Sequence, residues 1–157
     1  MKPVAVVISE PTWTIKAMHL ACALARNTQA PLILLDFRRT KNIALLGSGI
    51  GYDTPTMAEY VTLRDYFMIA EDYGVLMTVQ PVEYESYADT LVQMVELFTP
   101  TTLFTKAPKS LIPALSRFIT WQVRRQVEHL NCKLYTLDES FTSQEVLLPK
   151  MGVPVPK

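Results

Sequence analysis

The sequence predicts a doubly wound α/β fold, in which one five-stranded parallel sheet carries helices on both faces. Three observations lead to this fold class. Five short apolar runs have the length of strands, segments with helical spacing separate them, and the runs are apolar throughout instead of alternating. Strands separated by helices pair in parallel through right-handed crossovers, and strands this apolar must be covered on both faces.

The first two strands flank a helix. Residues Val4–Ile8 are β-branched and apolar, which indicates a buried strand, and Pro11 ends it. From Thr14 the spacing becomes helical, and Pro31–Phe37 forms the second buried strand. The stripe expected to face the core consists of Ile15, Met18, Cys22 and Ala25, widened by Ala17, Ala21 and Leu24.

A glycine-containing connection precedes the second helix. Residues 38–55 hold three of the five glycines and predict a long, mobile connection. Thr56 and Glu59 fit a capping box, in which each side chain satisfies a free backbone donor of the other residue. The helix is expected to end at Gly74, a left-handed C′ residue. Its predicted stripe is Tyr60, Leu63, Phe67 and Ala70.

The second half repeats this alternation. Strands are predicted over residues Val75–Val82, Thr101–Lys106 and Lys133–Asp138. One helix opens near Ser86 with Ala88, Leu91, Val92, Val95 and Phe98 on its inner face; another carries Leu115, Ile119, Val123, Val127 and Leu130. Residues 1–138 thus form one domain. Residues 139–157, with three prolines, are expected to run as an extended tail that could serve as a dimer arm.

Composition narrows the function classes. The 157 residues fit one domain, 49% of them are hydrophobic, and 15 basic residues balance 15 acidic ones. A neutral chain lacks the charge that nucleic-acid binders need, and no run is long enough to span a bilayer. We therefore expect no nucleic-acid or membrane partner, and a cytoplasmic protein without a signal segment. Cys22 and Cys132, the only cysteines, are expected to be reduced core residues.

Three local matches give the chain a family resemblance. The first is Val4-Ala5-Val6-x-x-Ser9-Glu10 together with Ala30–Leu35, and the second is Ala70–Val75. The third is Val123–Leu137, in which Glu128–Leu134 contains Cys132. In this order and spacing they resemble the universal stress proteins over most of the chain. The resemblance implies a sheet of order 3-2-1-4-5, of the type found in adenine nucleotide α hydrolases, and a homodimer that forms through the fifth strand.

Some members of that family bind ATP, and this chain departs from their pattern. They carry an aspartate at the end of the first strand, where Val7 stands here, and a glycine signature after the fourth strand. Glycine there allows positive φ and lets phosphate oxygens approach backbone N–H groups. No glycine occurs between Gly74 and Gly152, so ordinary ATP binding is not expected. The corresponding positions are Ala107, Ser110 and Thr120.

The candidate binding residues lie where the strand order should reverse, beyond the carboxyl ends of the strands. A phosphate-bearing ligand such as ATP or AMP, if one binds, is expected to contact Ser9, Lys106 and Ser110, with Lys109 nearby. The alternative is that both lysines are solvated loop residues. Residues Gly47–Gly51 do not fit a dinucleotide fingerprint, because they do not follow the first strand, but they could cover the crevice as a lid.

The remaining candidates have simpler interpretations. His19 and His129 lack partners at metal-ligand spacing, and His19 is expected to be partly buried on its helix. Cys132 is interpreted as inert despite its neighbour Lys133. Arg117, Arg124 and Glu128 form a stripe that is typical of a solvated face, with a partner surface as the alternative. Trp13 and Trp121 are interpreted as core or rim residues.

Three functions remain open. The favoured one is a non-catalytic, dimeric regulatory or binding module that resembles a universal stress protein and lacks ordinary ATP binding. The second is a nucleotide binder with a phosphate loop built from small non-glycine residues and lysines. The third is an adenylating enzyme of a related superfamily, which is disfavoured because residues 9–14 contain neither glycines nor paired histidines.

Overall fold

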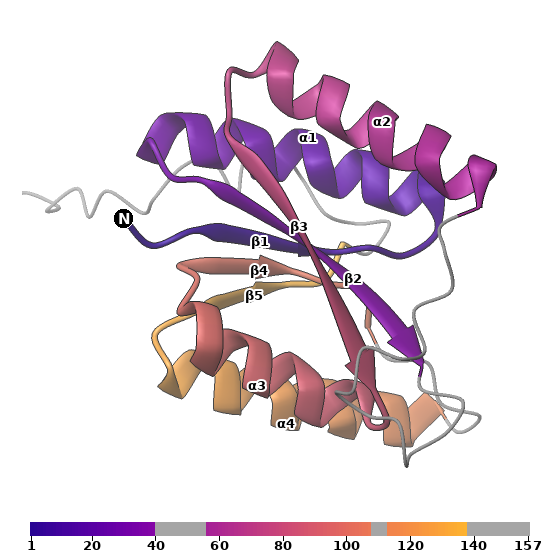
Figure 1. The fold of residues 1–157 in the computed structure, drawn as a ribbon. Helices are drawn as coiled ribbons and strands as arrows, with labels where there is room; N and C mark the ends of the chain where they lie inside the picture. Colours follow the sequence, from indigo (N-terminus) through magenta and orange to yellow (C-terminus); the bar gives the residue numbers. More distant parts are fainter. Residues whose placement is uncertain (40–55, 108–112, 138–157) are drawn as a thin grey trace, which may run out of the picture.

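The sheet has the architecture that the sequence predicts. The computed structural model describes residues 1–39, 56–107 and 113–137. Five parallel strands form one sheet of order β3-β2-β1-β4-β5, which confirms both the predicted fold class and the strand order (Figure 1). The strands are β1 (Val4–Val7), β2 (Leu32–Arg39), β3 (Met77–Tyr84), β4 (Thr102–Phe104) and β5 (Lys133–Tyr135).

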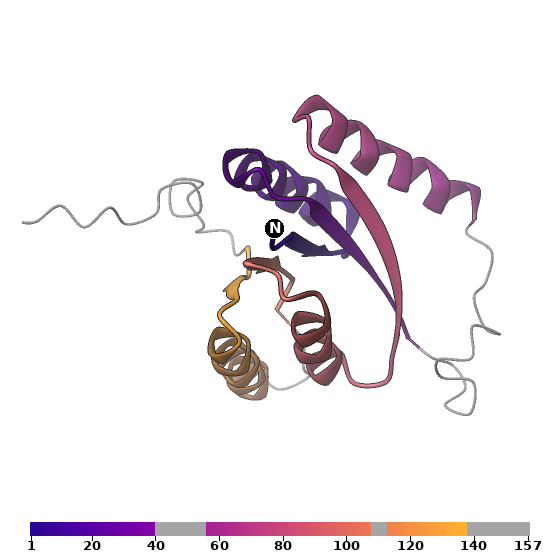
Figure 2. The ribbon, with the colours of Figure 1, turned by 60° about the vertical axis from the view of Figure 1, so that its left-hand side comes forward.

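Four helices cover the two faces of this sheet. Figures 1 and 2 show α1 and α2 on one face and α3 and α4 on the other. The side chains divide accordingly into two apolar clusters, one on each side of the sheet. The helices are α1 (Pro11–Thr28), α2 (Met57–Asp72), α3 (Tyr87–Phe98) and α4 (Pro113–His129). Among the described residues, no helix is long and apolar enough to cross a membrane.

Strand β1 joins the two clusters. Val4 and Val6 belong to the cluster beneath α1 and α2, whereas Ala5 and Val7 belong to the cluster beneath α3 and α4. All four side chains are buried, as expected for a strand that is covered on both faces. The strand ends one residue earlier than predicted, but the Ile8 N–H still donates to the Leu35 carbonyl oxygen at 2.9 Å.

Strands β2 and β3, which lie on the side of β1 away from β4, each end two residues later than predicted. β2 extends to Arg39 and β3 to Tyr84, paired along their whole length, whereas the predicted strands ended at Phe37 and Val82. Both therefore project beyond the end of β1 (Figure 1). This projection places side chains of β2 and β3 above the carboxyl ends of β1 and β4.

Helix α1 begins earlier than predicted and buries most of its predicted stripe, with Ile15 as the exception. Its first residue is Pro11, whose fixed φ and missing N–H suit the first helical position. Ile15, expected in the core, is 39% exposed, whereas Thr14 is fully buried. The Thr14 hydroxyl accepts from the Ser9 N–H and donates to the Glu10 carbonyl oxygen, and these bonds hold the Thr14 side chain on the inner face of the helix.

Helix α2 confirms the predicted ends and half of the predicted inner stripe. The capping box between Thr56 and Glu59 is present, and Gly74 adopts φ +67° after the last turn. The residues buried on this helix are Tyr66 and Ala70, whereas Tyr60 and Phe67 are 60% and 45% exposed, so their predicted burial was wrong. The predicted Leu63 and Ala70 do face α1, and Tyr66, Ile69 and Tyr73 join them there.

The last two helices largely match their predicted faces. On α3, Leu91 and Val95 are buried, and on α4 Val123 and Val127 are buried with Ile119 beside them. Leu115 was expected in the core but is 46% exposed, because the first turn of α4 lies beyond the end of the sheet that the later turns cover. Leu115 was therefore wrongly placed.

One buried polar atom stands out beneath α2. The Tyr66 side chain is 1% exposed, and its hydroxyl has no hydrogen-bond partner among the described residues. Burial raises the pKa of Tyr66; the Thr14 hydroxyl is near enough to offset part of this shift, but the two hydroxyls do not reach hydrogen-bond geometry. A buried hydroxyl without a partner costs free energy, because it loses its hydrogen bonds to water.

Replacing Tyr66 by phenylalanine should therefore stabilise the protein. We expect Tyr66→Phe to raise the free energy of unfolding by about 1 kcal/mol, measured by urea denaturation. Tyr73→Phe is the matched control, since the Tyr73 hydroxyl lies 3.3 Å from Nδ1 of His19 and its removal should not stabilise the fold. A loss of stability in Tyr66→Phe would show that the buried hydroxyl has a partner.

Candidate functional site

The described residues form a pocket at the point where the strand order reverses. β1 is followed in the chain by β2, but its other neighbour in the sheet is β4, so connections leave in opposite directions at the ends of β1 and β4. A pocket of about 360 Å³ opens there. Its lining residues are Ile8, Ser9, Glu10, Phe37, Tyr84, Tyr87, Lys106 and Ala107.

The floor of this crevice is the turn between β1 and α1. The Ser9 N–H donates to Oγ1 of Thr14 at 2.9 Å, and the Thr14 hydroxyl donates to the Glu10 carbonyl oxygen at 3.1 Å. Thr14 is fully buried, so its position is determined by the core. Ser9 Oγ donates to Oε2 of Glu10 at 3.3 Å. The turn therefore holds one hydroxyl and one carboxylate at the start of α1.

An ion pair closes one side of the crevice. Lys106, two residues beyond β4, donates from Nζ to Oε2 of Glu10, which follows β1. The side chains are 31% and 55% exposed, so water screens this pair. Because the ammonium already faces a carboxylate, a phosphate group that binds Lys106 must compete with Glu10.

Three aromatic rings form the opposite wall. Phe37 of β2, Tyr84 of β3 and Tyr87 of α3 contact one another with ring centroids 5.3–5.7 Å apart. The Tyr87 hydroxyl lies 2.7 Å from Oγ1 of Thr105, which fixes the ring against β4. Burial raises the pKa of Tyr87, and the contact with Thr105 offsets part of this shift. The wall is therefore aromatic, and contacts among its rings and with Thr105 hold it in place.

The structure brings together only some of the residues that the sequence suggested. Ser9, Lys106 and Ala107 line the same crevice. Val7 is fully buried in the α3/α4 cluster, and Thr120 lies on α4, where its hydroxyl donates to the Ser116 carbonyl oxygen at 2.8 Å. Neither residue lines the pocket. Lys109, Ser110, residues 47–51 and the tail 139–157 lie outside the described residues.

Sequence reasoning missed Glu10 as a partner of Lys106 and also missed the aromatic wall. Phe37 is far in sequence from Tyr84 and Tyr87, and its ring meets theirs because β2 and β3 run past the end of β1. A sequence signal does exist for Glu10, because it directly follows Ser9 at the end of the first strand. No spacing rule connects it with Lys106, which is 96 residues away.

The histidines and cysteines supply no reactive group among the described residues. His19 is exposed and contacts the Tyr73 hydroxyl, so its predicted partial burial was wrong. No three His, Cys, Asp or Glu side chains of the described segments lie close enough to hold a metal ion. Cys22 and Cys132 are buried and unpaired, as predicted. Burial raises the pKa of Cys22 to about 11 and that of Cys132 to about 12.

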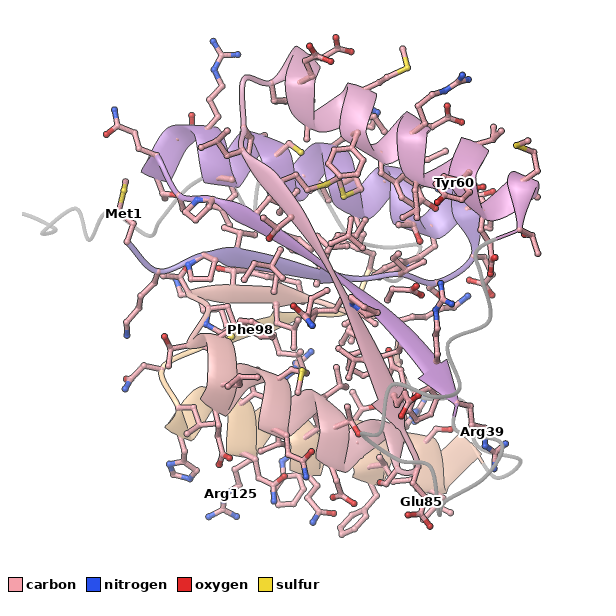
Figure 3. All side chains as sticks on the ribbon, viewed as in Figure 1. Met1, Arg39, Tyr60, Glu85, Phe98 and Arg125 are labelled. Carbon is pink, nitrogen blue, oxygen red and sulfur yellow. The ribbon has the colours of Figure 1, made fainter. Side chains whose placement is uncertain are left out.

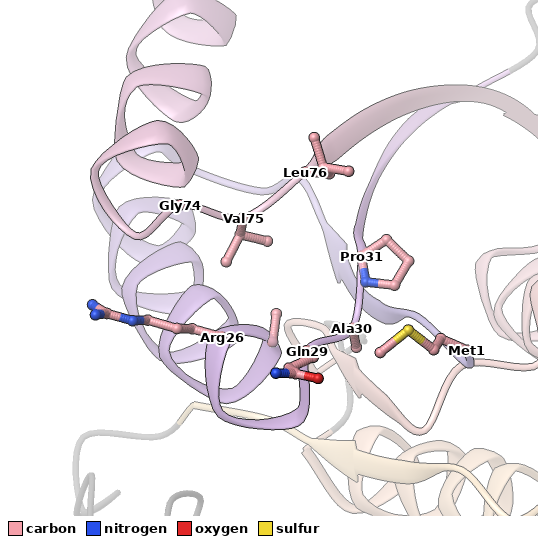
Figure 4. A pocket seen from close by; sticks show the side chains of 9 residues that line it. Met1, Arg26, Gln29, Ala30, Pro31, Gly74, Val75 and Leu76 are labelled. Atoms are coloured by element: carbon pink, nitrogen blue, oxygen red, sulfur yellow. The ribbon is translucent and has the colours of Figure 1, made fainter.

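A second hollow lies at the opposite end of the sheet. It measures about 500 Å³ and opens between the C-terminal ends of α1 and α2 (Figure 4). Arg26 is the one charged side chain among its lining residues, which also include Met1, Gln29, Pro31, Val75 and Leu76. This groove is far from the carboxyl ends of the strands and shares no residue with the crevice.

No family model matches the chain, and no curated protein matches it in sequence. Solved structures do match. A universal stress protein in complex with cAMP superposes with a TM-score of 0.59 at 15% identity, covering 89% of this chain and 100% of that one. A universal stress protein from Archaeoglobus fulgidus superposes with a TM-score of 0.57 at 13% identity, covering 88% and 94% of the two chains. The fold is that of the universal stress proteins.

A third solved structure of a universal stress protein adds to this agreement. The protein from Archaeoglobus fulgidus in complex with dAMP gives a TM-score of 0.52 at 12% identity, covering 88% of this chain and 98% of that one. Identities this low establish the fold alone. The universal-stress-protein fold nevertheless spans most of the chain, so the crevice described above can be compared with the same place in proteins of this architecture.

The buried thiols should be unreactive in the native protein. A raised pKa keeps both cysteines protonated at about pH 9, and the thiolate is the form that attacks a maleimide. We expect slow modification in the native state and rapid modification of both thiols in denaturant, followed by mass spectrometry. Met57→Cys, at a position that is 81% exposed, supplies the matched reactive thiol. Equally rapid labelling of the native wild type would contradict the buried environment.

Proposed function

We propose that the chain is a divergent, non-catalytic universal stress protein that binds an adenine nucleotide with a single phosphate in the crevice. One observation carries this proposal: an ammonium group and a wall of three aromatic rings face the same pocket. The ammonium suits a phosphate and the rings suit a base. The two relatives in fold that hold cAMP and dAMP support the same ligand class.

The phosphate end would lie between Lys106 and the start of α1. Lys106 supplies a charge, and the first turn of α1 points free N–H groups and the positive end of the helix dipole toward the same place. Pro11 removes one of these donors, so fewer amides are available than at a glycine-rich loop. This arrangement can hold one phosphate group.

The base end would lie against the aromatic wall. Phe37, Tyr84 and Tyr87 offer ring faces that are half-buried and held by one another. Stacking of a base on such a ring contributes about 1–3 kcal/mol and depends little on the identity of the base. The pocket volume of about 360 Å³ lies near the lower end of the range for small-molecule sites, which favours a mononucleotide.

The same residues disfavour a triphosphate. The Glu10 carboxylate stands beside Lys106 and repels additional phosphate charge. Ala107 places a Cβ where the ATP-binding universal stress proteins have glycine, and Val7 supplies no carboxylate for the ribose. We also infer no catalytic step, because the carboxylate that accepts from Ser9 is neutralised by Lys106.

A second candidate function is a regulatory module that binds no nucleotide. The Glu10–Lys106 ion pair favours it, because the pair satisfies the cation without a ligand. In either case we propose a homodimer that forms through the outer edge of β5, which is the terminal strand of the sheet. We propose a cytoplasmic location and a role in the stress response for both versions.

Calorimetric titration with AMP separates the two candidates. We expect Glu10→Gln to tighten AMP binding about tenfold, since it removes the competing anion but keeps the side-chain shape. Lys106→Ala should weaken binding by a similar factor, and Lys16→Ala, an exposed lysine further along α1, should leave the affinity unchanged. ATP should bind more weakly than AMP to each variant.

A different set of results would reject nucleotide binding. If AMP, cAMP and ATP produce no heat at millimolar concentration with both the wild type and Glu10→Gln, the module without a nucleotide is the better description. Tighter binding of ATP than of AMP to the wild type would contradict the single-phosphate site.

A further inference from the structure

Helix α2 has a second apolar face that packs against nothing in the described part of the chain. Its inner face lies on α1 through Leu63, Tyr66 and Ala70. On the outer face, five large apolar side chains are 44–81% exposed. A surface helix ordinarily has a polar outer face, so an exposed apolar stripe of this size indicates a contact surface. The five residues are Met57, Tyr60, Val61, Phe67 and Met68.

The spacing of these residues is that of a helix–helix contact. They recur at intervals of three, four and seven positions, so they share one side of the helix. Arg64 and Glu71 are exposed and fall in the same series. Figures 1 and 2 show α2 as an outermost helix with α1 on its other side, and Figure 3 marks Tyr60 near the N-terminal end of α2.

We propose that the outer face of α2 packs antiparallel against the same face of a second copy of this chain, through reciprocal ion pairs between Arg64 and Glu71. The two charges lie seven residues apart, or about 10 Å along the helix axis, so they do not pair within one chain. An interface with two-fold symmetry uses one patch twice, and the patch must therefore be complementary to itself.

Charge determines the direction of the two helices. In a parallel pair with two-fold symmetry, each residue faces its own copy, so Arg64 would meet Arg64 and Glu71 would meet Glu71. In the antiparallel arrangement each Arg64 can face Glu71 of the second copy, and both pairs are favourable. The symmetry axis then passes between positions 67 and 68, which places Phe67 and Met68 of both copies at the centre.

The same register extends the contact beyond the helix. In an antiparallel pair, the residue numbers of two facing positions always add up to the same value, here that of 64 and 71. Residue 60 of one copy therefore lies level with residue 75 of the other, and residue 61 lies level with residue 74. The groove of Figure 4 opens there, lined by Gly74, Val75 and Leu76. Leu76 is 84% exposed, which is unusual for leucine and is consistent with a contact at this place.

This surface is separate from the crevice and from the edge strand β5. The crevice lies at the carboxyl ends of β1 and β4, and β5 lies at the opposite edge of the sheet from β3. The α2 contact can therefore exist alone, giving a dimer, or can join two β5-linked dimers into a tetramer. It goes beyond the proposed nucleotide binding, and its test does not depend on any ligand.

The molar mass of the full chain in solution tests the proposal. We expect Met68→Lys to halve the mass measured by light scattering and to weaken association about a hundredfold, because each interface would bury two unpaired ammonium groups. Leu97→Lys on α3 is the matched control, since Leu97 is 67% exposed but lies on the other side of the sheet. It should leave the mass unchanged.

Charge reversal tests the register. Arg64→Glu and Glu71→Arg should each weaken association about tenfold, because each places like charges opposite one another twice. The double variant restores opposite charges and should return to within about threefold of the wild type. Arg124→Glu, at an exposed position on α4, is the control and should have no effect. Weak association in the double variant would reject the Arg64–Glu71 pairing.

Crosslinking provides an independent test of the α2 contact. Met68→Cys adds an exposed thiol to a chain whose two natural cysteines are buried, so a short bismaleimide should produce a covalent dimer. Leu97→Cys should not crosslink. The proposal would be overturned if Met68→Lys left the molar mass of the protein unchanged. It would also be overturned if the wild type were monomeric and Met68→Cys gave no crosslinked dimer. The latter result would mean that the chain covers this face with its own residues.

Discussion

The burial of β1 on both faces is the constraint on which the rest of the structure depends. Four consecutive apolar residues cannot leave either side of the strand in water, so one helix layer must cover each side. Val4 and Val6 face one layer and Ala5 and Val7 face the other. With β1 in the centre, the chain must add strands on both sides of it, and this requirement creates the reversal of strand order at its carboxyl end.

The crevice owes its chemistry to the same constraint. Thr14 is buried with the inner face of α1, and from there it holds the backbone of Ser9 and Glu10. β4 ends beside β1 because the two strands pair in register, so Lys106 reaches Glu10 although the residues are far apart in sequence. The phosphate site that we propose thus consists of a side-chain cation, a competing carboxylate and the start of a helix. Such a site favours a small charge over a triphosphate.

The need to bury a core does not explain the apolar residues on the outer face of α2. α2 has apolar residues all around its circumference, but α1 covers one side only. The apolar residues on the outside remain 44–81% exposed in the described domain, and the Arg64 and Glu71 charges suit the symmetric contact that we propose. A helix of this kind can mediate contact between two copies of the chain without involving the crevice.

The sequence by itself determined the elements and their order. Continuous β-branched runs and helical spacing predict every described strand and helix, and the Thr56 cap and Gly74 predict both ends of α2, because these signals act over a few residues. Ser9 and Lys106 were also predicted at the crevice. Only the tertiary structure decided which face of α2 is buried and that Glu10 and three aromatic rings complete the site. The physical reason is that a helix with two apolar faces satisfies local rules in either orientation, whereas ion pairs and ring contacts depend on how distant strands end relative to one another.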